Sequence, residues 1–177
     1  MKSDEKIKGS DRRELILQWL KENSQPLKGS WLAKKTNVSR QVIVQDISLL
    51  KAANEPIMAT AQGYVYMQAE EKQEHCAVVA SRHSPEETED ELNTMVDHGV
   101  LIRDVIVDHP VYGHLTASLM LSNRNEVRNF IKKLQDTKAS LLSELTEGVH
   151  LHTLSADSTA KLNSAIEALR QKGYILS

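Results

Sequence analysis

A polar, charged segment at residues 69–74 divides this chain into two parts with different hydrophobic patterns. The chain has 177 residues, which allows one or two small domains at about 150 residues per domain. Before the segment, apolar residues recur at helical spacing, whereas after it short strand-like runs alternate with helical ones. We therefore expect a flexible tail at residues 1–9, a first domain at 10–68, a linker at 69–74 and a second domain at 75–177.

The two parts also differ in charge. Residues 1–68 hold 11 Lys and Arg against 7 Asp and Glu, a net charge of +4, and the remainder has a net charge of −6 together with all 7 histidines. A basic first part is compatible with binding phosphate, and an acidic, histidine-rich second part is compatible with binding a cation. Ordinary solvated faces would give the same asymmetry.

The composition excludes several classes of protein. One cysteine cannot form a disulfide framework. Apolar runs such as Val100–Ile102 and Val105–Val107 fall far short of the about 20 residues that cross a bilayer. The polar N-terminus does not resemble a signal peptide. We therefore expect a soluble, cytoplasmic protein with no membrane partner.

The first domain is expected to contain three helices followed by a hairpin. Asp11, with Glu14 three residues later, resembles the capping box that starts a helix, and Pro26 ends that helix. Ser39 is expected to cap the third helix. The second helix is expected at 31–36, the third at 39–53, and the hairpin strands at 56–59 and 64–67. This order of elements is typical of a winged helix-turn-helix domain.

The start of the third helix carries the candidate DNA contacts, Ser39, Arg40, Gln41 and Gln45. In a helix-turn-helix protein this helix presents its N-terminal residues to base edges in the major groove. Glutamine can bond adenine through two hydrogen bonds, arginine suits guanine or phosphate, and a serine hydroxyl suits phosphate. Winged helices also serve as protein-interaction modules, but the polar face and the basic charge favour double-stranded DNA.

The second domain is expected to follow the order β-α-β-β-α-β, which is typical of a ferredoxin-like split β-α-β unit. The fold class is therefore α+β. Expected strands lie at 75–81, 100–108, 115–121 and 148–154, and expected helices lie at 84–97 and 125–135. A further helix at 158–172 and a short strand at 174–176 follow the unit.

Histidines supply the candidate chemistry of the second domain. His150 and His152 lie two residues apart, so on a strand they share one face about 7 Å apart and could both bind one metal ion. A polar solvent face would show the same pair. His83 lies at the junction of a strand and a helix. Glu91 is one of five acids that follow it, and its neighbour Leu92 places it nearer the apolar face, although spacing alone is a weak argument.

A shaped loop at 109–114 is the remaining candidate. His109 or Tyr112 could contact a small anion or another ligand. Pro110 and Gly113 equally suit a turn that serves only its own geometry.

Two resemblances cover most of the chain. The first domain is similar, over about 55 residues, to the winged helix of biotin-repressor-type regulators, through Val38-Ser39-Arg40, Ile43, Asp46-Ile47, Leu50 and Gly63-Tyr64. From about residue 10 to residue 175 the chain resembles the niacin-responsive transcription repressors, whose C-terminal part is a three-histidine domain. The residues that carry this second resemblance are His83, the acidic stretch Pro85–Glu91, residues 104–113 with His-Pro-Val-Tyr-Gly, Asn123-Arg124, and residues 145–153 with His-Leu-His.

The resemblance implies a repressor of niacin uptake and NAD biosynthesis genes, with nicotinic acid as co-repressor, and we expect it to act as a homodimer. It also implies one divalent metal ion per chain, held by His83, Glu91, His150 and His152. Three imidazoles and a carboxylate suit Ni or Zn, and also Fe or Co. We expect the loop that carries His109 and Tyr112 to close over the effector.

Other functions remain open at this stage. The serious alternative is a metal-responsive regulator in which the metal itself is the signal. A biotin ligase would need a much longer catalytic domain and a Gly-Arg-rich loop. A metal-dependent hydrolase would need room for water beside the metal, which four protein ligands reduce. We therefore do not expect an enzyme.

Overall fold

The computed structural model describes residues 7–67 and 74–176. The chain divides into two compact units, Met1–Glu70 and Glu71–Ser177. Residues 1–6 of the expected tail and 69–73 of the expected linker lie outside the described residues. Within the described part, no helix is both long and apolar enough to span a bilayer.

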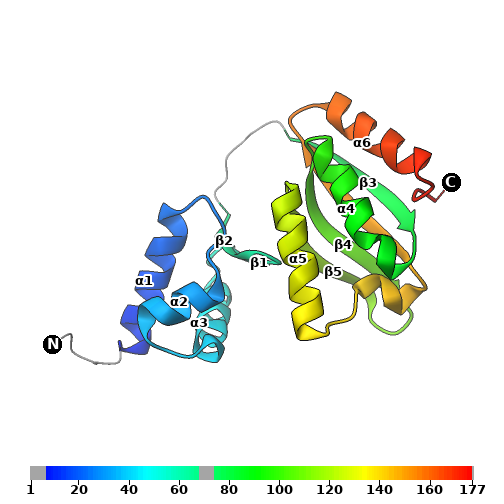
Figure 1. The fold of residues 1–177 in the computed structure, drawn as a ribbon. Coiled ribbons are helices and arrows are strands. Elements are labelled where there is room, and N and C mark those ends of the chain that lie inside the picture. Colours follow the sequence, from blue (N-terminus) through cyan, green and yellow to red (C-terminus); the bar gives the residue numbers. More distant parts are fainter. Residues whose placement is uncertain (1–6, 68–73, 177) are drawn as a thin grey trace. The chain divides into compact units, whose positions relative to one another are not determined.

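The first unit contains three helices and a two-stranded antiparallel sheet (Figure 1). Its elements are α1 (Gly9–Glu22), α2 (Gly29–Thr36), α3 (Arg40–Ala52), β1 (Ile57–Thr60) and β2 (Gly63–Tyr66). Apolar residues at helical spacing meet in one core, which includes Ile16, Leu20, Leu32, Ile43 and Ile47. The helix-turn-helix arrangement followed by a hairpin is therefore confirmed.

The two expected helix caps have different outcomes. Ser39 caps α3 as expected, because its side chain accepts a hydrogen bond from the Val42 backbone N–H. The capping box expected from Asp11 is wrong, since α1 already begins at Gly9 and Asp11 lies inside its first turn. Lys8 occupies the capping position without a side-chain hydrogen bond. An acidic residue in the first turn still interacts favourably with the helix dipole.

A buried ion pair joins the first and third helices. Arg12 Nε donates to Asp46 Oδ2 at 2.6 Å, and a second guanidinium nitrogen donates to Oδ1 at 3.2 Å. Both residues are buried, with exposed fractions of 8% and 2%. A two-point contact of this kind fixes the angle at which two helices meet.

The second unit is a four-stranded sheet with helices. Its strands are β3 (His75–Arg82), β4 (Leu101–His109), β5 (Gly113–Leu121) and β6 (Val149–Ala156). Its helical segments are η1 (Pro85–Glu87), α4 (Thr88–Asp97), α5 (Arg124–Thr137), η2 (Leu142–Thr146) and α6 (Thr159–Gln171). Figure 1 shows the three α-helices on one face of the sheet.

The strand order is β3-β6-β4-β5, and all neighbouring strands are antiparallel. β6 therefore separates β3 from β4, and the expected split β-α-β arrangement is present. A ferredoxin-like sheet has the first and third strands of the unit at its centre, whereas here the second and fourth, β4 and β6, are central. This order places the two histidines of β6 between β3 and β4.

Two segments differ from expectation. The strand expected at 174–176 is reduced to an isolated bridge between Ser81 and Ile175. The connection between α5 and β6, for which no element was expected, forms η2. η2 contributes to the lining of a pocket in the second unit.

Candidate metal centre and adjoining pocket

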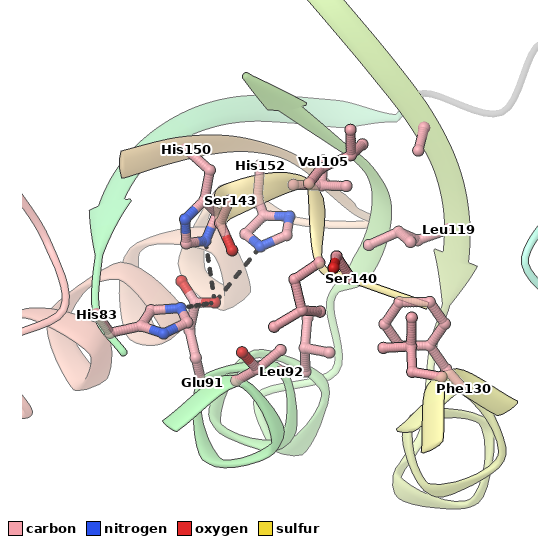
Figure 2. Close-up of a pocket in the computed structure, with 15 residues that line it drawn as sticks. His83, Glu91, Leu92, Val105, Leu119, Phe130, Ser140, Ser143, His150 and His152 are labelled. Carbon is pink, nitrogen blue, oxygen red and sulfur yellow. Dashed lines mark hydrogen bonds and ion pairs between the residues drawn. The ribbon is translucent and has the colours of Figure 1, made fainter. Parts of the chain in front are cut away.

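Three imidazoles converge on one buried carboxylate in the second unit. Glu91 Oε2 lies 2.7 Å from His83 Nε2, 3.3 Å from His150 Nε2 and 3.4 Å from His152 Nε2. Figure 2 shows all three rings turned toward the Glu91 side chain. These four residues are called the histidine–glutamate cluster below, and they are the four metal ligands that the resemblance implied.

Local structure explains how each residue reaches the cluster. His150 and His152 point to the same side of β6 because alternate residues of a strand share a face. β6 pairs with β3 through Ser81 and His150, which brings the end of β3, and with it His83, next to these histidines. A capping box between Ser84 and Glu87 then starts the helical turn that leads into α4.

Burial distinguishes Glu91 from the other acids that follow His83. Glu91 is fully buried, whereas Glu86, Glu87, Glu89 and Asp90 are exposed. Glu91 lies on the same side of α4 as the buried Leu92 and Met95. Glu91, for which the sequence spacing was only a weak argument, is therefore the one acid of these five that faces inward.

Each imidazole is oriented by a backbone carbonyl on its other nitrogen. The Nδ1 atoms lie 2.7 Å from Ser84 O for His83, 2.8 Å from Gly148 O for His150 and 2.7 Å from Asp104 O for His152. A carbonyl can only accept, so each Nδ1 carries the proton. In a neutral ring the Nε2 lone pair then faces Glu91, an orientation that metal-binding histidines commonly show.

Mutual charge perturbs the ionisation of the cluster. Burial raises the pKa of Glu91, but the charge of His152 and hydrogen bonds from the three histidines outweigh it and hold this pKa well below its usual value. Burial lowers the pKa of His83 and of His152, but the Glu91 carboxylate outweighs it in both and raises their pKa values. Without a cation, these interactions therefore favour the charged forms of Glu91, His83 and His152.

The cluster fits a divalent transition metal. The ligand atoms of His83, Glu91 and His150 all lie within 4.8 Å of one another. Glu91 Oε1 is buried and has no hydrogen-bond partner among the described residues, which is costly for a carboxylate oxygen unless a further group binds there. Three imidazole nitrogens and one carboxylate oxygen match the ligands that Zn, Ni, Fe and Co accept.

A pocket of about 170 Å³ adjoins the cluster. Its apolar wall includes Leu92, Val105, Leu119 and Phe130, and Figure 2 shows Leu119 and Phe130 at the end away from the histidines. Its polar end includes Thr88, whose buried hydroxyl oxygen has no hydrogen-bond partner among the described residues. Pockets that bind drug-sized ligands have volumes of about 300–1,000 Å³, so this pocket suits a smaller molecule with one apolar and one polar end.

Much of the wall comes from segments in which the sequence predicted no site residue. Residues 140–143, in and before η2, and Phe130 and Leu134 of α5 all line the pocket. The apolar spacing of the helix expected at 125–135 was the one available signal for α5. No pattern signalled η2, because its contribution depends on how the chain returns to β6.

The structure does not bring His109 and Tyr112 to this pocket. They lie at the turn between β4 and β5, where Tyr112 is 74% exposed. His109 Nδ1 accepts hydrogen bonds from the backbone N–H groups of Val111 and Tyr112 at 3.2 and 3.3 Å. In this structure His109 therefore serves the geometry of the turn.

The candidate DNA-contacting residues lie on the exposed side of α3 in the first unit. Ser39, Arg40, Gln41 and Gln45 are all exposed. Val44, which is 43% exposed, shares the face of Gln41 and was not among the candidates. An exposed valine on this face suits the methyl group of thymine, and the helical spacing already indicated its position.

Known proteins resemble the chain over nearly its full length. Family models match an HTH domain at residues 12–65 and a 3H domain at residues 76–177. The "Transcription repressor NadR" of Bacillus subtilis (strain 168) is 53% identical over 178 residues, which cover 99% of each chain. The "Probable transcription repressor NiaR" of Thermotoga maritima is 38% identical over 166 residues, which cover 94% of each chain.

Proposed function

The chain belongs to the NadR/NiaR family of niacin-responsive transcription repressors, and we propose that it represses genes of niacin uptake and NAD biosynthesis with nicotinic acid as co-repressor. Relatives that cover its whole length are named transcription repressors, so the chain is a DNA-binding regulator and not an enzyme. In this proposal the first unit binds the operator and the second unit senses the effector.

For the first unit, we assign operator reading to the exposed face of α3. Gln41 and Gln45 would contact base edges, while Arg40 and Ser39 would contact guanine or phosphate. A homodimer would place two such helices about 34 Å apart, so that they meet successive major grooves. The exposed polar face and the net positive charge of this part of the chain support the assignment.

For the second unit, we assign one divalent metal ion per chain to the histidine–glutamate cluster. The observation that carries the whole proposal is the convergence of three Nε2 atoms on the buried Glu91 carboxylate at one end of an apolar pocket. Nickel or zinc is expected, and iron or cobalt would also suit the ligands. When bound, such an ion would supply a positive charge at the polar end of the pocket.

Nicotinic acid matches this pocket in size and polarity. Its flat ring would lie against Leu119 and Phe130, and its carboxylate or ring nitrogen would face the cluster. The Thr88 hydroxyl, which has no hydrogen-bond partner in the described part of the chain, would donate a hydrogen bond to the carboxylate. Because His109 and Tyr112 lie outside the pocket, we assign the effector contacts to the pocket wall instead.

Repression requires that the two binding events be coupled. Nicotinic acid strengthens operator binding only if it binds the DNA-competent state more tightly than the other state. Coupling of this kind is typically about 1–3 kcal/mol, or about 5–150-fold in affinity. By linkage, operator DNA would strengthen nicotinic acid binding by the same factor.

Operator binding measured by fluorescence anisotropy at one fixed salt concentration tests the proposal. The full chain is titrated with and without nicotinic acid, before and after chelation, with nicotinamide as the ligand that lacks the carboxylate. We expect nicotinic acid to tighten binding and chelation to abolish the effect.

Two variants make the test specific to the cluster. His150→Ala should lose the response, whereas His98→Ala should keep it, since His98 lies outside the cluster and bonds Thr94 of its own helix. An operator affinity that saturating nicotinic acid leaves unchanged would refute the co-repressor. Tightening by metal alone would establish the metal-responsive regulator instead.

A further inference from the structure

The end of the chain beyond α6 turns back against the segments that carry two of the cluster residues. Tyr174 is buried there, with 8% of its surface exposed. Its backbone N–H donates to Leu169 O, which turns the chain sharply after α6. Figure 1 shows this end of the chain beside β3.

The ring of Tyr174 packs against the imidazole of His83. The ring centroids are 5.4 Å apart at an angle of 67°, an edge-to-face arrangement. His83 follows the end of β3 and is the one histidine of the cluster that does not lie on β6. Its Nδ1 bonds only to the carbonyl of the next residue, Ser84. The Tyr174 ring therefore adds a packing contact to the two polar contacts that orient this imidazole, Ser84 O and Glu91 Oε2.

The hydroxyl of Tyr174 reaches the helix that carries Glu91. It donates a hydrogen bond to Asp90 Oδ2 at 2.7 Å, and Lys172 Nζ donates to both oxygens of the same carboxylate at 2.8 and 2.7 Å. Asp90 immediately precedes Glu91 in the first turn of α4. Tyr174 thus contacts His83 with its ring, and with its hydroxyl it contacts Asp90, the residue next to Glu91.

Backbone hydrogen bonds fix Tyr174 in this position. The Arg82 N–H, next to His83, donates to Tyr174 O at 2.9 Å, and the Leu176 N–H donates to Ala80 O at 2.9 Å. These bonds extend the edge of β3 and hold the backbone of Tyr174 next to the residue that precedes His83. They place the aromatic ring against the histidine by backbone geometry.

We propose that Tyr174 is a positioning residue of the metal site, which sets the separation of His83 and Glu91 and slows the loss of the bound ion. The inference rests on the proposed function only in requiring that the cluster bind a metal ion. Metal affinity is sensitive to such outer contacts, and removing one typically weakens binding about 10–100-fold. Position 174 holds neither a histidine nor an acid, so the pattern of candidate ligands in the sequence does not indicate Tyr174.

Two substitutions separate the contributions of the ring and the hydroxyl. Tyr174→Leu removes the ring from His83, and Tyr174→Phe keeps the ring but removes the bond to Asp90. The full chain is loaded with Co²⁺, its visible absorption spectrum is recorded, and release of the ion to a chromogenic chelator is timed. We expect Tyr174→Leu to release Co²⁺ about 10-fold faster or more with an altered spectrum, and Tyr174→Phe to fall between it and the wild type.

A matched control is available in the first unit. Tyr66 donates a hydrogen bond to Glu55 Oε2 at 3.1 Å, so Tyr66→Phe removes the same kind of tyrosine–carboxylate bond far from the cluster in sequence. It should leave both the Co²⁺ spectrum and the release rate unchanged. Loss of Co²⁺ ligand geometry in a variant that retains the wild-type circular dichroism distinguishes positioning from a general loss of folding.

The outcomes separate this inference from the proposed function. A wild type that binds Co²⁺, together with folded Tyr174 variants of unchanged spectrum and release rate, overturns the role of Tyr174 alone. If Tyr174→Leu does not fold, Tyr174→Phe decides by the same two measurements. A wild type that binds neither Co²⁺ nor Ni²⁺ overturns the metal site and this inference together.

Discussion

Replacing Glu91 with glutamine is the sharpest test of the metal site, because it keeps the shape of the side chain and removes its charge. The carboxylate is fully buried and contacts all three imidazoles. We expect Glu91→Gln to lose most of the stabilisation that a metal ion gives to the second unit.

The magnitude follows from binding linkage. A metal ion at about 100 times its dissociation constant stabilises the folded state by about 2.7 kcal/mol. For a unit of this size, about 4–8 °C per kcal/mol converts this to about 11–22 °C in Tm. Loss of an outer contact weakens metal binding by up to about 100-fold, and we take loss of a direct ligand to weaken it at least as much. At the same metal concentration, the ion then stabilises the variant by about 0.4 kcal/mol, or about 2–3 °C in Tm.

Scanning calorimetry of the full chain, with and without the metal ion, measures this difference. Each variant is compared with its own metal-free form, because glutamine also changes the stability of the metal-free cluster. Glu89→Gln is the matched control, since Glu89 is an exposed acid in the same helical turn. A metal-dependent shift in Glu91→Gln as large as that of the wild type would show that Glu91 does not bind the metal ion.

Three further predictions concern the buried ion pair of the first unit, the exposed face of α3 and the pH dependence of the second unit. Asp46→Asn should destabilise the first unit by about 3–5 kcal/mol in urea unfolding, because it leaves the buried Arg12 guanidinium without its charged partner. A loss of stability below about 1 kcal/mol would contradict this role of the ion pair. Gln41→Ala should weaken operator binding by about 1–3 kcal/mol without changing its salt dependence, and a changed salt slope in the anisotropy titration would instead indicate a phosphate contact. The metal-free second unit should be most stable between about pH 4.5 and 6.5. The raised pKa values of His83 and His152 give stability that is present below pH 6.5 and is lost as the pH rises through these raised values. The lowered pKa of Glu91 gives stability that is present above pH 4.5 and is lost as the pH falls through this lowered value. Unfolding measured from this range upward in pH should show the alkaline loss without metal and not with it, because metal binding requires neutral imidazoles. A metal-free unit that grows more stable above pH 6.5 would disprove the charge assignment.

Several features of the first unit followed from short-range chemistry. The Ser39 cap was predictable because a capping side chain bonds a backbone N–H only a few residues away. The start of α1 was placed two residues too late, since a helix that begins without a side-chain cap leaves no local signal. The pairing of Arg12 with Asp46 was not predicted, because it joins residues 34 positions apart.

In the second unit, local periodicity determined that His150 and His152 would share a face, since the period of two belongs to any strand. Identifying the full set of four ligands needed the resemblance to a known family. His109 and Tyr112 were candidates for effector contact from a shaped loop, but the tight turn between β4 and β5 holds them away from the pocket.

By itself, therefore, the sequence determined the division into two parts, the order of elements and the residue types that carry the chemistry. Each of these depends on neighbours within a few turns of helix or a few residues of strand. Tertiary structure decided which of them meet. The strand order brings β6 beside β3, and the packing of α4 turns Glu91 inward. Tyr174 joins the site only because the chain end pairs with β3, and long-range contacts of this kind leave no periodic trace in a sequence.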